Sequence, residues 1–268
     1  MTGVEGEFMM NLERLKNNWE SLAERDALFA ILTDHRRVGG KWNVDEFMAT
    51  GKAEIETVMH HLASIGCIPN YAGKALDFGC GVGRLTQALA PHFASCVGVD
   101  ISLQMIDKAK SLNRYAHCRY MANSAEQLPF ADASFSFIYS NIVLQHVPQR
   151  FSTAYLREFV RVLAPGGILV FGVQDSFAAP DVASLVLRVR HVLRIRSRIR
   201  AAVGVGDMRM HCLPESVVRS ALGSARIVDI QFTNTAAKDF NGKLVYLRQA
   251  PTSGYVGKQY CVVSESRM

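Results

Sequence analysis

The 268-residue sequence lacks the features of secreted and membrane-spanning proteins. No apolar run approaches the roughly 20 residues that a transmembrane helix needs. The first ten residues carry Glu5 and Glu7, where a secretory leader carries positive charge followed by an apolar stretch. The six cysteines form no CxxC pair and no tightly spaced zinc motif. We therefore expect a cytoplasmic protein with reduced thiols and no metal site.

Charged residues are few, at 20% of the chain against 49% hydrophobic residues, which argues against disordered and fibrous classes. The net charge of +6 comes from one segment, because Arg188 to Arg200 holds six arginines and no acid. In a helix, Leu185, Val189 and Val192 would fall on one face and arginines on another, which is the pattern of a basic amphipathic helix. Three interpretations are open: a solvated helix face, a surface for an anionic or lipid-linked substrate, and a nucleic-acid contact.

Apolar residues at steps of three and four predict helices over residues 8–24, 25–32 and 45–65, the last disturbed at Gly51. From Lys74 onward, short apolar runs alternate with helical patterns, which is typical of βαβ units and a parallel sheet. The expected strands cover residues 75–78, 96–99, 118–122, 135–140, 168–173, 227–233 and 260–264. We expect four regions: a helical cap over 1–73, a ligand-binding core over 74–174, a basic insertion or lid over 175–212, and a C-terminal part over 213–268 that supplies one helix and the last two strands.

A glycine-rich loop joins the first expected strand to the helix that follows it. Glycines at 79, 81 and 83 allow the backbone to turn sharply and to approach a ligand closely. A dinucleotide-binding fingerprint needs GxGxxG, but the sixth position is Arg84 counted from Gly79 and Thr86 counted from Gly81. The spacing therefore disfavours a nicotinamide dinucleotide as the ligand.

Five segments in this part of the chain resemble the class I S-adenosylmethionine-dependent methyltransferases of the small-molecule type. Asp77 followed by the three glycines is similar to the family's first motif, and Asp100 ends the second strand. The other three matches cover residues 123–130, 135–148 and 161–167. Asn123 and Ser136 depart from the pattern, since each replaces a common acid. The resemblance implies a Rossmann-like, doubly wound α/β fold with a seven-stranded, mostly parallel sheet and a helical N-terminal cap.

The resemblance also implies S-adenosylmethionine as the cofactor and indicates where it binds. A carboxylate at Asp100 can accept hydrogen bonds from both ribose hydroxyls. The helix-starting Arg84 would reach the cofactor carboxylate or Asp77, or would form a surface ion pair. Cys80 fits as a small side chain beside the ligand, because nothing nearby in the sequence would activate its thiol. The implied cofactor-binding residues are Asp77, Gly79, Cys80, Gly81, Gly83, Arg84, Asp100, Ile101, Met105, Ser124, Ala125, Ser140, Asn141 and Gln145.

The reaction that the resemblance implies is an in-line methyl transfer, in which positioning supplies most of the catalysis. An alcohol acceptor would also need a general base, worth about 100-fold to 10,000-fold. His146 is the candidate base, and structural support of the turn after the fourth strand is its alternative role. His35 and His211 lie in the cap and the insertion. Trp42 and Phe47 would either close over the cofactor as a lid or pack within the cap.

The expected acceptor is a small molecule, with O-methylation of a sugar, lipid-linked or secondary-metabolite hydroxyl favoured. The alternatives are an RNA methyltransferase and a non-catalytic protein that binds S-adenosylmethionine or S-adenosylhomocysteine as a partner. The fourth strand runs into Ser140-Asn141-Ile142-Val143, which is not the (D/N)PP(Y/F) turn of many nucleic-acid methyltransferases, and no proline precedes a cysteine. Ser140 and Asn141 also stand where metal-assisted catechol methylation wants carboxylates.

Overall fold

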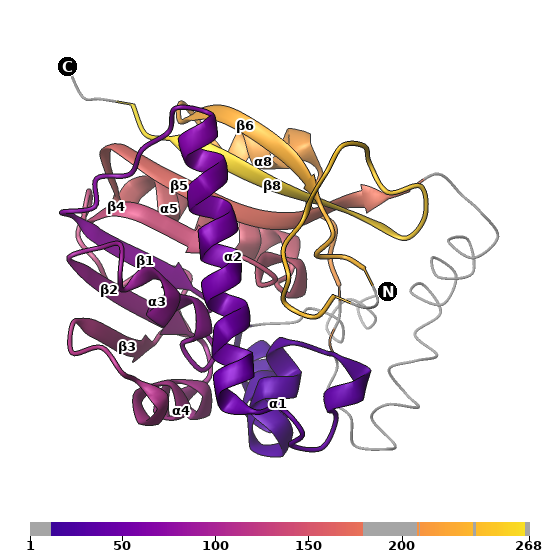
Figure 1. The fold of residues 1–268 in the computed structure, drawn as a ribbon. Helices are drawn as coiled ribbons and strands as arrows, with labels where there is room; N and C mark the ends of the chain where they lie inside the picture. The colour runs from indigo at the N-terminus through magenta and orange to yellow at the C-terminus, as the bar shows by residue number, and fades with distance from the viewer. Residues whose placement is uncertain (1–11, 179–207, 209, 238–239, 266–268) are drawn as a thin grey trace, which may run out of the picture.

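The computed structural model describes residues 12–178, 208, 210–237 and 240–265. They form one eight-stranded sheet with the order β3-β2-β1-β4-β5-β8-β6-β7 (Figure 1). The basic segment from Arg188 to Arg200 and the start of the first expected helix lie outside the described residues. The strands are β1 (Lys74–Phe78), β2 (Ser95–Asp100), β3 (Cys118–Ala122), β4 (Phe135–Ser140), β5 (Leu163–Phe177), β6 (Arg226–Thr233), β7 (Tyr246–Leu247) and β8 (Tyr255–Val263).

The mostly parallel α/β architecture is confirmed, and the expected count of seven strands is wrong. Strands β1 to β5 run parallel, while β8 is antiparallel to both β5 and β6. The eighth strand is β7, which pairs with β6 through Tyr246 and Leu247. Two residues are too few to show an alternating pattern, so the pairing partner defines this strand.

Helices cover both faces of the sheet because successive strand residues point to opposite sides. Ala75 and Phe137 face a core shared with α2 and α3, whereas Leu76 and Ile138 face a core shared with α5 and α8. Figure 1 shows α2 crossing one face, with α5 and α8 on the other. The helices are α1 (Leu12–Ile31), α2 (Val44–Ser64), α3 (Arg84–Leu89), α4 (Leu103–Leu112), α5 (Gln149–Val162) and α8 (Glu215–Leu222), with short 3₁₀ turns η1 (His35–Arg37) and η2 (Leu144–His146).

Helix α1 changes direction at Asp26, whose backbone is non-helical at φ −163° and ψ 86°. This matches the expected division between residues 24 and 25. The Asp26 carboxylate caps the second part by accepting from the amide of Phe29 at 3.1 Å, and it also accepts from the amide of Gly40 at 2.7 Å. The first part docks on α4, because Glu20 accepts hydrogen bonds from the amides of Leu103 and Gln104.

Helix α2 runs unbroken through Gly51, so the expected disturbance there is wrong. Asn43 caps its first turn by accepting from two backbone amides. Gly51 is buried, and a Cβ atom at this position would lie 2.5 Å from the carbonyl oxygen of Arg84. The glycine thus serves the close approach of α2 to α3. Because α2 packs on the sheet itself, the division of the chain into a cap and a core stays a prediction.

Candidate functional site

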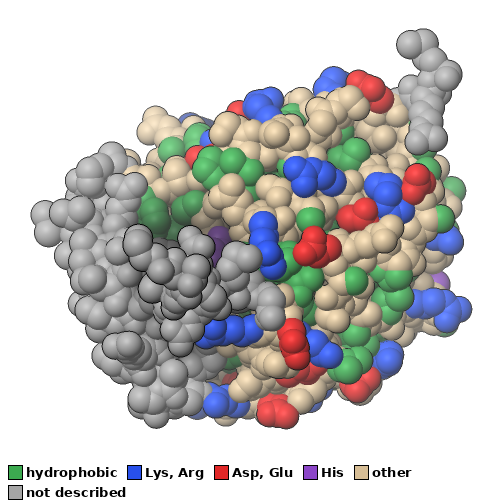
Figure 2. All heavy atoms as spheres, turned by 180° about the vertical axis from the view of Figure 1, so that it is seen from behind, with side chains coloured by type: hydrophobic (Ala, Val, Ile, Leu, Met, Phe, Trp, Pro, Cys, Tyr) green, Lys and Arg blue, Asp and Glu red, His purple; other side chains and the backbone are tan. Residues whose placement is uncertain are grey.

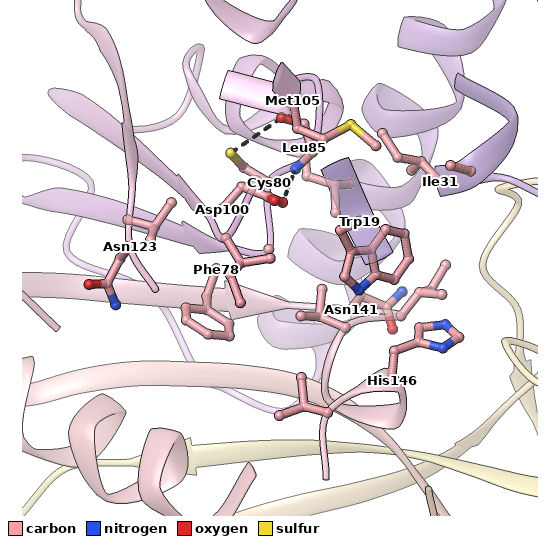
Figure 3. Close-up of a pocket in the computed structure, with 18 of the residues that line it drawn as sticks. Trp19, Ile31, Phe78, Cys80, Leu85, Asp100, Met105, Asn123, Asn141 and His146 are labelled. Atoms are coloured by element: carbon pink, nitrogen blue, oxygen red, sulfur yellow. Dashed lines mark hydrogen bonds between the residues drawn. The ribbon is translucent and has the colours of Figure 1, made fainter. Parts of the chain in front are cut away.

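A pocket lies at the carboxyl ends of β1, β2 and β4, where the strand order reverses between β1 and β4. Ligands of open α/β sheets bind at such reversals. The empty space, including the part open to solvent, is about 930 Å³. Its floor is the glycine-rich loop, and Leu15 and Trp19 of α1 contribute to its wall. Figure 3 shows Trp19 at this wall.

The glycine-rich loop turns back against β2 directly after β1. The amides of Gly79 and Cys80 both donate to the carbonyl oxygen of Val99, at 2.7 and 3.0 Å. Gly79 and Gly81 have φ values of +75° and +51°, which side chains other than glycine rarely adopt. A Cβ atom on Gly81 would lie 2.5 Å from Ile31. Main chain is therefore exposed where a side chain would otherwise fill the pocket floor.

Asp100 ties the end of β2 to this loop. One carboxylate oxygen accepts from the amide of Gly81 at 2.8 Å, and the other accepts from the amide of Ser102 at 2.9 Å. Burial raises the pKa of Asp100 to about 6, although the hydrogen bonds from these amides lower it. Each carboxylate oxygen can accept a further hydrogen bond. The side chain can therefore bind a diol from the pocket side while it holds the loop.

Asp77 lies behind the loop and is 1% exposed. One oxygen accepts from the hydroxyl of Thr86 at 2.6 Å, and the other is buried without a hydrogen-bond partner. Burial raises the pKa of Asp77 to about 7. The residue is not among those that line the pocket, so its place in the structure is that of a support for the loop and α3.

Arg84 lines the pocket but makes neither the expected contact with Asp77 nor a surface ion pair. Its guanidinium pairs with Glu54 of α2 at 2.8 Å, and both side chains are buried. A second bond reaches the hydroxyl of Thr50 at 3.3 Å. The same Glu54 carboxylate accepts from the side-chain amide of Asn141 at 2.8 Å and from the hydroxyl of Tyr139 at 2.9 Å. These side chains form a buried cluster that the sequence analysis did not predict.

His146 ends the 3₁₀ turn η2 and lines the pocket opposite Trp19. The two rings meet edge to face with their centroids 5.6 Å apart (Figure 3). The side-chain nitrogen of Gln145 lies 3.3 Å from Nε2 of His146. The side-chain oxygen of Gln145 accepts from Gln174 at 2.7 Å, so the side-chain nitrogen of Gln145 is the atom that faces His146. A nitrogen of this kind donates, and Nε2 of His146 would be the accepting atom.

A family model described as a methyltransferase domain matches residues 76–171. The biotin biosynthesis bifunctional protein BioHC of Cellvibrio japonicus is 38% identical over 146 residues, which are 52% of this chain and 28% of that protein. The 27-O-demethylrifamycin SV methyltransferase of Amycolatopsis mediterranei is 29% identical over 178 residues, 64% of this chain and 62% of that one. The solved magnesium protoporphyrin IX methyltransferase of Synechocystis PCC 6803, with bound S-adenosylhomocysteine, superimposes with a TM-score of 0.60 at 19% identity, covering 95% and 99% of the two chains. Residues 76–171 are therefore similar to a methyltransferase domain, and the fold of the chain is that of the solved methyltransferase.

The matches to curated relatives are partial. The chain spans less than half the length of three relatives that it matches, at 28%, 28% and 43%. In the part of the chain that the structure describes, no helix is long and apolar enough to cross a membrane. The same residues contain no group of three or more acidic, histidine or cysteine side chains arranged to hold a metal ion.

Nine of the residues expected at the site line the pocket, and the others do not. Ser140 donates to the carbonyl oxygen of Phe78 at 3.0 Å, inside the sheet, and Gln145 is buried beside Gln174. Ser124 and Ala125 are exposed beyond the rim. The nine are Gly79, Cys80, Gly81, Arg84, Asp100, Ile101, Met105, Asn141 and His146. Of the rest, Asp77, Gly83, Ser140 and Gln145 support the pocket from behind.

The remaining aromatic and histidine candidates are placed as follows. Trp42 and Phe47 are buried against each other with ring centroids 5.5 Å apart, so they belong to the core around α1 and α2 and not to a lid. His35 begins the exposed turn η1. The amide of His211 donates to the carbonyl oxygen of Gln145 at 2.6 Å, which brings the end of the expected insertion to η2.

Sequence reasoning missed the wall that α1 contributes to the pocket through Leu15, Trp19 and Ile31. The signal was present, since Leu15 and Trp19 belong to the apolar face of the first expected helix. Cys80 agrees with the expectation of a small inert side chain, because burial raises the pKa of its thiol well above the ordinary value. Asn123 also lines the pocket and holds its own loop by donating to Ala125 at 3.1 Å.

The residues present fit an adenosyl ligand that ends in an amino acid. A Cβ atom at Gly79 or Gly81 would collide with Val143 or Ile31, so the glycines let these pocket-lining side chains pack against the loop. Asp100 keeps acceptor capacity for ribose hydroxyls. At another part of the pocket, the Nε atom of Arg84 and the side-chain oxygen of Asn141 are buried without partners. Polar atoms of this kind are rarely left unpaired, so a polar ligand group is expected near them.

Proposed function

We propose that this chain transfers the methyl group of S-adenosylmethionine to a small-molecule acceptor, by O-methylation of a sugar, lipid-linked or secondary-metabolite hydroxyl. The observation that carries the proposal is the hydrogen bond from Gly81 to Asp100. This bond brings the glycine-rich loop and the acid of β2 to one pocket at the reversal of the strand order. The family model and the fold agree with this reading.

Asp100 would bind the ribose hydroxyls, and the main chain of the loop would lie against the body of the cofactor. The bound cofactor supplies an electrophilic methyl group on a sulfonium. The protein's part is to hold an acceptor in line with that group and to exclude water from it, which is the main source of rate in such displacements. The apolar side chains of Leu15, Trp19 and Val143 form a wall suited to that exclusion.

His146 would serve as the general base for an alcohol. The side-chain nitrogen of Gln145 lies 3.3 Å from its Nε2 atom and is placed to donate to it. An acceptor hydroxyl would have to replace the Gln145 amide as the donor to this atom. The competing interpretation is that the pair only fixes the turn η2, and the His146 variant described in the Discussion separates the two.

The apolar wall supports an acceptor with an apolar body. Several relatives carry names of the expected kind, including a tocopherol O-methyltransferase of Arabidopsis thaliana and a malonyl-[acyl-carrier protein] O-methyltransferase of Erwinia pyrifoliae. Another relative is a sterol C-methyltransferase, so the relatives differ in the atom that they methylate. An anionic or lipid-linked acceptor depends on the segment from Arg188 to Arg200, and it stays a prediction, as does the cytoplasmic location.

An RNA substrate receives no support from the face of the molecule shown in Figure 2. Acidic and basic side chains are interspersed there, and nucleic-acid binding surfaces are dominated by basic ones. Retention on RNA that falls steeply with added salt would favour this alternative. A protein that binds the cofactor product but transfers no methyl group to any acceptor would support the non-catalytic alternative.

The proposal is tested by calorimetric titration with S-adenosylhomocysteine, followed by an acceptor screen that measures release of the same product. Asp100→Ala should weaken product binding by about tenfold or more, since it removes charged acceptors of about 1.5–3 kcal/mol. Asp107→Asn, on the exposed side of α4, is the control and should bind as the wild type does. Absence of binding to the wild type, or an unchanged affinity in Asp100→Ala, would refute the assignment.

A further inference from the structure

A buried acid outside the matched family segment anchors part of the pocket wall. Glu54 of α2 has no exposed surface, and Arg84 is 3% exposed. One carboxylate oxygen of Glu54 accepts from the Arg84 guanidinium at 2.8 Å. The other oxygen accepts from Asn141 at 2.8 Å and from Tyr139 at 2.9 Å. Three donors from α3 and the end of β4 thus meet at one carboxylate of α2.

Stability alone is a weak reason to keep this cluster. Moving two charges out of water costs free energy that their attraction often fails to recover, and apolar residues of similar volume commonly serve as well. The hydrogen bonding of the cluster is also incomplete. The Nε atom of Arg84 is a donor without an acceptor, and the side-chain oxygen of Asn141 is an acceptor without a donor.

Both incompletely bonded residues line the pocket, while Glu54 and Tyr139 do not. Glu54 uses its two oxygens on the far sides of Arg84 and Asn141, so it fixes these side chains from behind. Gly172 of β5 leaves the space that the Asn141 amide occupies, because a Cβ atom there would collide with its oxygen. The geometry therefore presents an unpaired cationic donor and an unpaired neutral acceptor on one wall.

We propose that Glu54 is a positioning residue that holds Arg84 and Asn141 for the amino-acid end of the cofactor. The inference rests on the proposed function. The cofactor's carboxylate matches the charge and the free donor of Arg84, and its ammonium matches the free oxygen of Asn141. Glu54 acts through these two residues and does not touch the ligand.

The test compares two ligands that differ only in this end. S-adenosylhomocysteine carries the amino acid, whereas 5′-methylthioadenosine has the same adenosyl thioether with a methyl group in its place. Glu54→Gln is the variant, because all three neighbours donate to Glu54 and an amide nitrogen cannot accept from any of them. Titration calorimetry should show at least a tenfold loss of affinity for S-adenosylhomocysteine and less than a threefold change for 5′-methylthioadenosine.

The matched control is Glu158→Gln in α5. Glu158 also pairs with an arginine, Arg161 at 2.7 Å, and accepts from the amide of Leu128 at 2.7 Å, but it does not line the pocket. This variant should leave the affinity ratio of the two ligands unchanged. If Glu54→Gln does not fold, Glu54→Asp keeps the charge while retracting the carboxylate, and it should lower the same ratio.

The outcomes separate this inference from the proposed function. A wild type that binds S-adenosylhomocysteine, together with Glu54 variants whose affinity ratio stays within twofold of the wild-type value, overturns the positioning role and leaves the methyltransferase proposal intact. A wild type that binds neither ligand overturns both. An equal loss of affinity for both ligands shows a general structural role for Glu54 and also overturns the inference.

Discussion

Replacing Asp77 by asparagine should change how the stability of the protein depends on pH. Burial raises the pKa of this carboxyl from its ordinary 3.8 to about 7. An acid whose pKa is raised by folding contributes stability below its unfolded pKa, and this contribution is lost as the pH rises through the folded value. At about 1.4 kcal/mol per pKa unit, the full contribution is at most about 4 kcal/mol. Most of it, about 3 kcal/mol, would be lost between pH 5 and pH 8.

The assay is denaturant unfolding of the wild type and Asp77→Asn at intervals from pH 5 to pH 8. Asparagine keeps an oxygen that can accept from Thr86 and never ionises. The free energy of unfolding of the variant should therefore rise by about 3 kcal/mol relative to that of the wild type as the pH goes from 5 to 8. Asp100 has a pKa raised to about 6 and adds a slope of the same sign to both proteins, which cancels in the difference. Asp107→Asn on the exposed side of α4 is the control. A difference between Asp77→Asn and the wild type that stays constant within about 0.5 kcal/mol would refute the reasoning.

Three further substitutions test separate parts of the site. Glu20→Ala removes the acceptor that caps α4 from α1 and should lower the free energy of unfolding by about 1–2 kcal/mol in chemical denaturation, while the exposed Glu13→Ala on the same helix should change it little. Gly51→Ala places a Cβ atom 2.5 Å from the backbone of Arg84 and should cost about 1–3 kcal/mol by the same measurement; a neutral effect would contradict the close packing of α2 on α3. His146→Ala should reduce turnover at least about 100-fold with the affinity for S-adenosylhomocysteine unchanged, and a loss below about threefold would remove it as the base.

The first four strands could be predicted from the sequence to within about one residue at each end. They belong to the parallel part of a sheet that helices cover on both faces, so their apolar runs are nearly continuous. Strands β5 and β8 are longer than expected because they pair with each other out to Phe177 and Tyr255, beyond the apolar runs. Lys258 and Gln259 lie inside β8 and interrupt its apolar pattern. The first part of this strand is therefore recognised from its pairing with β5 and not from the sequence.

The glycine-rich loop and Asp100 could be placed together because carboxyl ends of neighbouring parallel strands meet at one edge. Glu54 could not be assigned in this way, since 30 residues separate it from Arg84 and no motif connects them. One signal was present in the sequence. Glu54 follows Gly51 by three residues and precedes Val58 by four, so a carboxylate interrupts the apolar stripe of α2. Buried charges need partners, and this position could have been marked as one that requires a cation.

Asp100 and helix α1 are joined through one turn, which links the acid at the end of β2 to the pocket wall. The amide of Ser102 donates to Asp100 at 2.9 Å, while its hydroxyl donates to Glu20 at 2.9 Å. That hydroxyl also accepts from the amide of Met105 at 3.1 Å, which caps α4. Ser102 is fully buried, so these bonds are shielded from water. The orientation of Asp100 and the docking of α1 on the start of α4 therefore share one buried serine.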